Sequence, residues 1–463
     1  MEEAQFNIKI KDYRAISEAD IDINGITVLS GVNGCGKSSI SFFLYNFLNT
    51  LLNFDIHVNK EIYNKIKKPL ELIDQLLTEI ELESNIAPSI INGEIGQTRL
   101  FIDVLLKNLT NDRNKLKGKS SIDSIINNIF DGTSSILNVL INKNLITNSL
   151  STNIERINSI IKNSYLKKNG SNSSDNIIEN IESLKNILNN TVTETEKFRN
   201  NPPKFFIDLL LSNIYLKKEN FDSITIKEYS AKIYSSKQER VIIPKSINET
   251  FYIDSPNMLE GYDEFNILGQ HKKSLQDKIR TTNNNISNLK NDIASYIHDK
   301  VLHGSIEHDE QPTNGDLFKY NRNDGKVFNL SDCATGIKSF AIIEMLYVKG
   351  LINSNTLLII DEPEVHLHPQ WVVEYARLVV LLNKHLGVKF LIASHHPEFV
   401  SSIRYISEKE KTTSGLNFYI AEEAENDSFK FKYKHLGIEI EGAFESFNKS
   451  FELFDQYIEE DEI

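Results

Sequence analysis

Short apolar runs near the start of the chain predict strands that lie next to a helix. FNIKI, at residues 6–10, alternates apolar and polar side chains, and ITVLS, at residues 26–30, is a β-branched run that stops at a glycine-rich loop. From Ser38 onward, apolar residues recur at spacings of three and four, which predicts a helix. This end of the chain therefore predicts strands followed by a loop and a helix.

The C-terminal third shows a related pattern. TLLIIDEPE (356–364) and VKFLIAS (388–394) are continuous apolar runs, which suit strands buried on both faces of a parallel sheet. Residues 371–387 lie between them and predict a helix that ends at Gly387. We therefore expect one α/β core that is assembled from both ends of the chain.

The middle of the chain, residues 51–325, is rich in Asn, Ile, Lys and Ser, and its helical periodicity is broken by polar stretches. Two periodic segments flank a polar turn at residues 168–176, which predicts an antiparallel helical hairpin. Residues 272–301 predict another long helix, and residues 223–234 and 240–245 predict strands. A hairpin is expected around Gly325.

Composition narrows the class of protein. The 463 residues include only two cysteines, Cys35 and Cys333, so a disulfide framework is not expected. No apolar run is long enough for a membrane span, and the N-terminus has no secretory pattern, so we expect a cytoplasmic protein without membrane partners. The net charge of −13 argues against a general DNA-coating protein.

The strongest chemical signal is GVNGCGKSS, residues 31–39, which has the spacing of a phosphate-binding loop between a strand and a helix. Glycines allow backbone N–H groups to close on phosphates, Lys37 supplies a positive charge, and the Ser38 hydroxyl is placed to bind Mg²⁺. The alternative is a chance glycine-rich turn. The candidate ATP-binding residues in this loop are Asn33, Gly34, Cys35, Gly36, Lys37, Ser38 and Ser39.

A second signal lies at the end of the run LLIID. The strand delivers Asp361 to the phosphate end of the sheet, where it can hold Mg²⁺ together with Ser38. Glu362 follows, and its carboxylate is the candidate general base for the attacking water. Taken alone, an apolar run that ends in Asp-Glu is more often an ordinary strand end.

The segment ASHHPEF follows the next strand, and we expect His395 to face the γ-phosphate. A zinc site that uses His366, His368, His395 and His396 is a weaker alternative, because their spacing matches no common zinc framework.

A further segment, ATGIKS, opens a helix whose N-terminus can bind an anion. This helix cannot easily reach the phosphate bound by Lys37, but it can reach a nucleotide held by a second subunit. Thr335, Gly336 and Lys338 are therefore candidate contacts in trans. The alternative is an ordinary capped helix.

As a set, these motifs resemble those of the ABC-type ATPases of the RecF, SMC and OLD branch. The loop resembles Walker A, LLIIDEPEVHLHP resembles Walker B with the D-loop, and ATGIKS stands at the signature motif. KDYRAI resembles the opening strand of the family and implies that Arg14 lies near the nucleotide. Ala334 stands where the family signature has a serine, and the glutamine loop of the family has no recognisable counterpart.

The resemblance implies an α/β fold, namely an ABC-type P-loop ATPase head assembled from N- and C-terminal segments with a long, mostly helical insertion. Residues 1–50 are expected to form the N-terminal lobe with Walker A. Residues 51–325 are expected to form the insertion, with some strands. Residues 326–463 are expected to form the C-terminal lobe and a short tail. ATP and Mg²⁺ are the implied cofactors, and a head-to-tail dimer or higher homo-oligomer is the implied assembly.

Within this branch, DCATGIKSFAIIEML and DEPEVHLHPQW are most similar to the PtuA-type ATPases of Septu and Septu-like retron anti-phage systems. This resemblance implies an ATPase that senses and regulates a separate effector nuclease of the HNH (PtuB-like) type, without a nuclease site of its own. A DNA-repair ATPase of RecF or SMC type, with nucleic acid as a partner, is the alternative. A module in which ATP is structural is a third interpretation.

Overall fold

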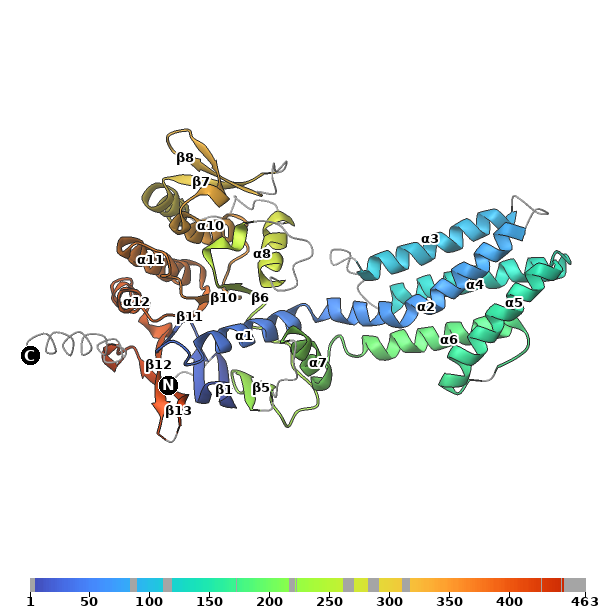
Figure 1. Cartoon of the computed structure of the whole chain (residues 1–463), viewed down its shortest axis with the longest axis horizontal. Helices are drawn as coiled ribbons and strands as arrows, with labels where there is room; N and C mark the ends of the chain where they lie inside the picture. Colours follow the sequence, from blue (N-terminus) through green and yellow to red (C-terminus); the bar gives the residue numbers. More distant parts are fainter. Residues whose placement is uncertain are drawn as a thin grey trace, which may run out of the picture. The chain divides into compact units, whose positions relative to one another are not determined.

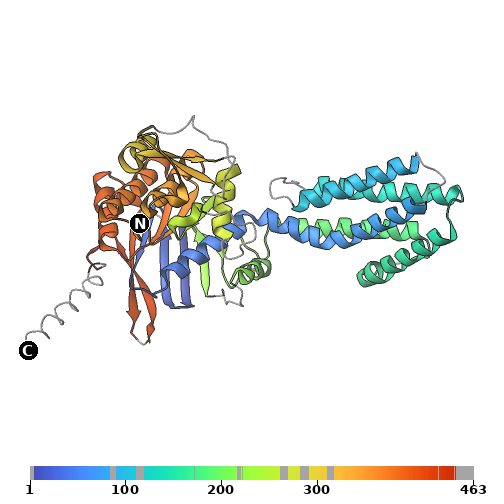
Figure 2. The same cartoon turned by 45° about the horizontal axis from the view of Figure 1, so that its top comes forward.

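The computed structural model describes residues 5–83, 90–110, 119–171, 173–215, 221, 223–260, 270–281, 291–309, 317–425, 427–442 and 444. The chain forms two compact units (Figures 1 and 2). The head unit contains Met1–Leu52 and Lys204–Ile463, and the helical unit contains Asn53–Pro203. The segment expected as one insertion, 51–325, is thus divided between the two units.

The head unit is organised around one sheet, which has ten strands among the described residues. Strands from the two ends of the chain and from its middle lie side by side in this sheet. In sheet order they are β5 (Ala231–Tyr234), β4 (Ile224–Glu228), β1 (Phe6–Tyr13), β2 (Ile16–Ile23), β13 (Asp427–Gly437), β12 (Leu416–Ala424), β3 (Ile26–Ser30), β11 (Lys389–Ala393), β10 (Thr356–Asp361) and β6 (Glu249–Ile253).

Five neighbouring strands, β12, β3, β11, β10 and β6, run parallel, whereas β1 pairs antiparallel with β2 and β4. Every residue of β3 and β11 is buried, and for β11 this agrees with the prediction from the continuous apolar run at residues 388–394. The carboxyl ends of the parallel strands lie at one edge of the sheet, which is where loops that bind ligands are usually found. The expected α/β head assembled from both ends of the chain is confirmed.

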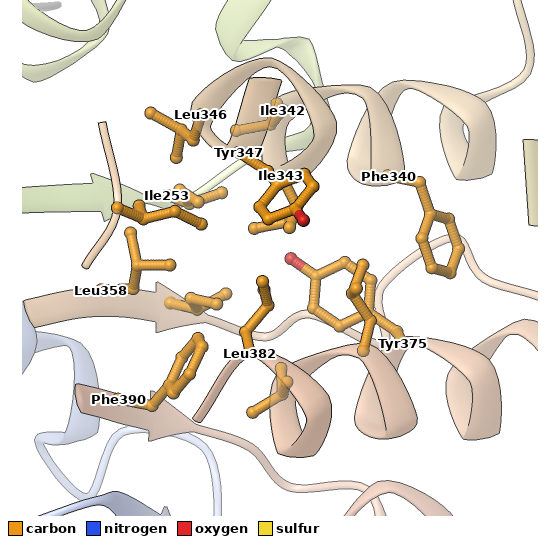
Figure 3. Close-up of a cluster of buried hydrophobic side chains, with 14 of the residues drawn as sticks. Ile253, Phe340, Ile342, Ile343, Leu346, Tyr347, Leu358, Tyr375, Leu382 and Phe390 are labelled. Atoms are coloured by element: carbon orange, nitrogen blue, oxygen red, sulfur yellow. The ribbon is translucent and has the colours of Figure 1, made fainter. Parts of the chain in front are cut away.

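Helices cover the sheet. The head unit contains α1 (Lys37–Leu52), α7 (Lys204–Ile214), α8 (Gln270–Thr281), α9 (Asn291–Ser295), a π-helix (Tyr296–Leu302), α10 (Thr335–Val348), α11 (Pro369–Leu386) and α12 (Pro397–Lys409). Figure 3 shows how α10 and α11 pack on the sheet: Phe340 and Tyr347 of α10 lie near Tyr375 and Leu382 of α11. The glycine expected to end α11 does so, because Gly387 has a left-handed conformation with φ of 70°.

A small second sheet lies in the head unit and is formed by β7 (Gly304–His308), β8 (Phe318–Arg322) and β9 (Val327–Asn329). Strands β8 and β9 form the expected hairpin, with Gly325 at φ of 85° in the turn. The chain passes from this hairpin into α10, so the predicted signature segment follows the small sheet directly.

The helical unit contains α2 (Phe54–Glu83), α3 (Ile90–Thr110), α4 (Lys119–Asn142), α5 (Asn148–Ile161), a π-helical turn (Lys162–Leu166) and α6 (Ile177–Glu196). Helices α5 and α6 form the predicted hairpin. The buried Asn180 amide secures it by donating to Asn158 Oδ1 and to the Ser174 carbonyl, both at 2.7 Å. None of the described helices of the chain is long and apolar enough to cross a membrane.

Three features of the middle segment differ from the sequence predictions. Residues 241–245 form no strand, and the backbone makes only an isolated bridge at Arg240. The reason is that Pro244 has no N–H group to donate to a neighbouring strand. The helix expected at 272–301 is α8 up to Thr281, and α9 with the π-helix from Asn291; residues 282–290 lie outside the described residues. Strand β6 was missed, and it pairs with β10 in the main sheet.

Candidate nucleotide site

The predicted phosphate loop connects β3 to α1 and has the backbone that such a loop requires. Gly34 and Gly36 have φ of 84° and 99°, a region that favours glycine. A Cβ atom at Gly36 would lie 2.8 Å from Cγ1 of Ile16, so any larger residue would displace the loop. A Cβ atom at Gly34 would meet nothing within 4 Å, which leaves room for a phosphate to approach the backbone closely.

Lys37 is held inside this loop. Its side chain is buried, and Nζ donates to the carbonyls of Gly31 at 2.8 Å and Val32 at 3.1 Å. Of the other predicted loop residues, Cys35 is buried, Ser39 is half-buried, and Asn33 and Ser38 are exposed. The positive charge and an accessible hydroxyl therefore lie at the start of the same helix, where its dipole also favours an anion.

Asp361, the last residue of β10, lies beside the start of α1. Its Oδ2 accepts a hydrogen bond of 2.7 Å from the Tyr252 hydroxyl, and its Oδ1 has no hydrogen-bond partner among the described residues. Burial raises the pKa of Asp361. The hydroxyls of Tyr252, Ser41 and Ser38 oppose this effect in part, and the pKa stays above its usual value. A free carboxylate oxygen next to the Ser38 hydroxyl is a donor set that fits Mg²⁺, which prefers oxygen ligands. Mg²⁺ bound there would neutralise phosphate charge.

Glu362 and His395 face one another at the ends of adjacent strands. Glu362 has φ of 47°, and its N–H donates to the Ala393 carbonyl at 2.8 Å, which extends the pairing of β10 with β11 by one residue. His395 Nδ1 lies 3.4 Å from Glu362 Oε1, and both side chains are 39% exposed. The predicted base and the predicted γ-phosphate contact therefore meet beside Asp361, where a water molecule can reach both.

Glu364 was not predicted as a site residue, yet it contacts the same loop. Its buried carboxylate accepts hydrogen bonds from the Ser394 hydroxyl at 2.9 Å and from the His395 N–H at 3.2 Å. The sequence signal was present in DEPE, where a second carboxylate follows Glu362 at a spacing of two.

Two further residues near Asp361 also escaped prediction because β6 was missed. Tyr252 belongs to β6, and Asp254 follows it, where its carboxylate contributes to the raised pKa of Asp361. His271 Nε2 lies 2.9 Å from Asp254 Oδ2. A pocket of about 150 Å³ lies between Asp254, Asp361, Glu362 and Ser339 of α10. The loop after β6 thus borders the predicted metal ligand, although it contains no glutamine between residues 254 and 260.

The predicted signature residues open α10. The Thr335 hydroxyl donates to the His366 carbonyl at 3.3 Å, and Gly336 packs so closely that a Cβ atom there would lie 2.6 Å from Trp371 Cε3. Lys338 Nζ donates to the Ser331 carbonyl at 2.7 Å and pairs with Glu260. Ala334, at the N-cap, makes no side-chain cap. The Lys338 charge is therefore paired within its own chain.

Arg14 lies in the turn between β1 and β2 with φ of 52°. Its guanidinium lies over the rings of Tyr13 and Tyr215, at 5.4 Å and 5.0 Å from their centroids. The next two residues along the chain are Ala15 and Ile16, and a Cβ atom at Gly36 would contact both. The turn that carries Arg14 therefore adjoins the phosphate loop.

The four histidines considered as zinc ligands do not form a metal site. In the described part of the chain, no group of three or more His, Cys, Asp and Glu side chains is arranged to hold a metal ion. His368 instead caps α11, where it accepts a hydrogen bond from the Gln370 N–H.

A family model described as an AAA ATPase domain matches residues 6–400. The chain belongs to this family. The match covers the phosphate loop, the helical unit, the signature segment, the strand that ends at Asp361 and the loop that contains His395. This AAA ATPase is therefore an ATPase of the P-loop class with a mixed α/β head. No curated protein matches its sequence.

Solved structures similar to this AAA ATPase include heads of Smc proteins. One is the Smc head domain with an extended coiled coil bound to the C-terminal domain of ScpA, derived from Pyrococcus furiosus, with 9% identity, a TM-score of 0.31, and coverage of 97% of this chain and 98% of that chain. Another is the Smc head bound to the C-winged helix domain of ScpA, with 11% identity, a TM-score of 0.30, and coverage of 95% and 98%.

Proposed function

We propose that this AAA ATPase binds ATP with Mg²⁺ at the loop of residues 31–39 and hydrolyses it. The observation that carries the proposal is the convergence of the Asp361 carboxylate with the Ser38 hydroxyl, next to the facing pair of Glu362 and His395. Lys37 and the loop amides bind the phosphates, and Asp361 with Ser38 holds the metal. Glu362 accepts a proton from the attacking water.

The proposed active site is shared between two copies of the chain. Thr335 and Gly336 open a helix whose N-terminus contributes positive potential to a nucleotide bound by the partner copy. Arg14 contributes at the nucleotide of its own copy. A head-to-tail dimer, or a larger homo-oligomer built on the same contact, therefore carries the ATPase activity.

We further propose that the ATPase regulates a separate effector nuclease in a bacterial anti-phage complex of the PtuA type, and that it is cytoplasmic. The residues of the signature and Walker B segments that resemble those of PtuA-type ATPases support this assignment. The helical unit is the proposed docking part for the nuclease. The charge of the helical unit gives no support to a DNA-repair role. Residues 53–203 contain 18 Lys and Arg and 18 Asp and Glu, so this unit has no excess of positive charge to bind DNA phosphates.

The test uses the purified full chain and the nuclease that the proposal predicts to be encoded beside it. The chain alone should release phosphate from ATP with Mg²⁺ and leave plasmid, linear DNA and tRNA intact. Adding the nuclease should give cleavage that depends on Lys37. Cleavage by the chain alone would contradict the regulatory role. So would a nuclease activity that is the same with and without the chain.

Docking is best tested with point substitutions, since α6 packs on the rest of its unit through contacts such as Asn189 with Asn127 and Lys65 with Thr195. Deleting the α5–α6 hairpin would therefore disrupt the whole unit. Leu82 and Leu100 are 74% and 60% exposed, and changing both to Glu should weaken co-purification of the nuclease. The matched control is Phe205→Glu, at a side chain that is 67% exposed in the head unit. Unchanged co-purification would show that these helices are not the docking surface.

A further inference from the structure

Glu364 is a buried carboxylate that faces a half-exposed histidine. Its side chain is only 3% exposed, and that of His395 is 39% exposed. Oε1 of Glu364 accepts hydrogen bonds from the Ser394 hydroxyl and the His395 N–H, and lies 3.6 Å from His395 Nδ1. One carboxylate oxygen therefore holds the backbone of this histidine by a hydrogen bond and places a negative charge beside its ring.

Burying a carboxylate is costly unless hydrogen bonds or an opposite charge compensate for the lost hydration. The compensation for Glu364 is incomplete, because Oε2 has no hydrogen-bond partner among the described residues. An apolar residue would avoid this penalty at a buried position. The contacts of Glu364 with residues 394 and 395 therefore indicate a role beyond packing.

The geometry also selects one nitrogen of the His395 ring. Nδ1 faces two carboxylate oxygens, at 3.4 Å from Glu362 and 3.6 Å from Glu364. Nε2 lies on the other side of the ring, and the side chain is 39% exposed. A protonated ring donates from both nitrogens, so it can bind a carboxylate at Nδ1 and a phosphate oxygen at Nε2.

We propose that Glu364 is a positioning residue that holds His395 with Nε2 directed at the γ-phosphate of bound ATP. This inference rests on the proposed function, because it requires ATP in the loop that contains Lys37. Glu364 touches no phosphate itself. Glu364 acts through His395. By holding this histidine, it gives the site a preference for a nucleoside triphosphate over a diphosphate.

The chain offers a matched control at Glu228. This carboxylate is also buried, and it accepts hydrogen bonds from the backbone N–H groups of Lys245 at 2.9 Å and Ser246 at 2.6 Å, neither of which belongs to a histidine. A purely structural loss should be similar at Glu228 and at Glu364. Only a loss of γ-phosphate recognition should be specific to Glu364.

The experiment measures the affinities of the full chain for ATPγS and ADP by calorimetry with Mg²⁺. We expect Glu364→Ala to weaken ATPγS binding by roughly tenfold or more, which is typical of losing a charged hydrogen-bond partner, and to leave ADP binding unchanged. Glu364→Gln keeps an oxygen acceptor for Ser394 and should lose less. Glu228→Gln should keep the wild-type ratio of the two affinities.

The double variant separates positioning from a direct effect. Because Glu364 acts through His395, His395→Ala should lose the same preference, and adding Glu364→Ala should weaken ATPγS binding no further. A wild-type ratio of affinities in Glu364→Ala, or additive losses in the double variant, would overturn the inference. Failure of the wild-type chain to bind either nucleotide would instead overturn the proposed function.

Discussion

The Tyr252 hydroxyl donates a 2.7 Å hydrogen bond to Oδ2 of Asp361, and the two residues lie on neighbouring parallel strands. Tyr252 comes from the middle of the chain, whereas Asp361 comes from the C-terminal part. The bond occupies one carboxylate oxygen, and Oδ1 has no hydrogen-bond partner among the described residues. A residue that the motif pattern does not include therefore orients the predicted metal ligand.

Tyr252→Phe should raise the Mg²⁺ concentration required for half-maximal ATPase activity by about tenfold, as is typical when a hydrogen bond to a metal ligand is lost. The measurement is a Mg²⁺ titration of phosphate release. Tyr45→Phe is the control, because Tyr45 stacks on Tyr252, with ring centroids 5.6 Å apart, and its hydroxyl interacts with Ser274. An equal shift in both variants would show that loss of any buried hydroxyl in this aromatic cluster weakens metal binding, and that the bond to Asp361 has no special role.

Lys37→Ala should abolish binding of ATP and of ADP, because the loop amides alone would have to hold several negative charges. Calorimetry measures this directly. Lys384→Ala, which removes an exposed ion pair with Glu410 on the surface of α11 and α12, should bind as the wild type does. Wild-type affinity in Lys37→Ala would rule out the loop as the phosphate site.

Mixing two inactive variants tests whether the site is shared between copies. One variant must block the contact between the N-terminus of α10 and the partner's nucleotide. Gly336→Arg would clash with Trp371 in its own chain, so we choose Ala334→Arg, because Ala334 is exposed at the N-terminus of α10. Mixed dimers of Ala334→Arg with Lys37→Ala should regain at most one working site per dimer. If mixed dimers form and no ATPase activity returns at any ratio, the site lies within one chain.

The pair of His298 and Glu344 should make stability depend on pH. His298 Nε2 lies 2.6 Å from the buried Glu344 carboxylate, which raises the pKa of His298 above its value in the unfolded chain. The stabilisation is therefore fully present below about pH 6.5 and is lost as the pH rises through the higher folded-state pKa. Burial raises the pKa of Glu344 as well, which acts in the same direction.

The check is the melting temperature of the wild type and of Glu344→Gln between pH 6 and pH 8. The advantage of the wild type should be largest at pH 6 and should shrink toward pH 8. Glu228→Gln changes a buried carboxylate whose partners are backbone N–H groups, so its difference from the wild type should not follow this trend. A pH-independent advantage over Glu344→Gln would contradict the assigned ion pair.

The sequence predicted those parts of the site that lie within continuous motifs. The loop around Lys37 and the strand that ends at Asp361 carry local signals, namely glycine spacing and an apolar run, and the structure has both elements. Tyr252 and Asp254 carry no such signal, because β6 is only five residues long and contains Glu249 and Thr250. Its place in the sheet depends on pairing with β10, about a hundred residues away along the chain.

The role of Glu364 was hidden for a similar reason. Its position beside Glu362 is visible in the sequence, but its bonds to Ser394 and His395 join residues that are 30 and 31 positions apart. Only the pairing of β10 with β11 brings the two loops together. By contrast, the missing strand at residues 241–245 had a local signal, because Pro244 interrupts their apolar, β-branched composition.

ATP turnover by Glu362→Gln tests the central claim most directly. The amide cannot accept a proton from water, so phosphate release should fall by roughly 10² to 10⁴ relative to the wild type, while ATP affinity measured by calorimetry should not change. That result would place the base at Glu362, in the site formed by Lys37, Ser38 and Asp361. Phosphate release at the wild-type rate would contradict the account.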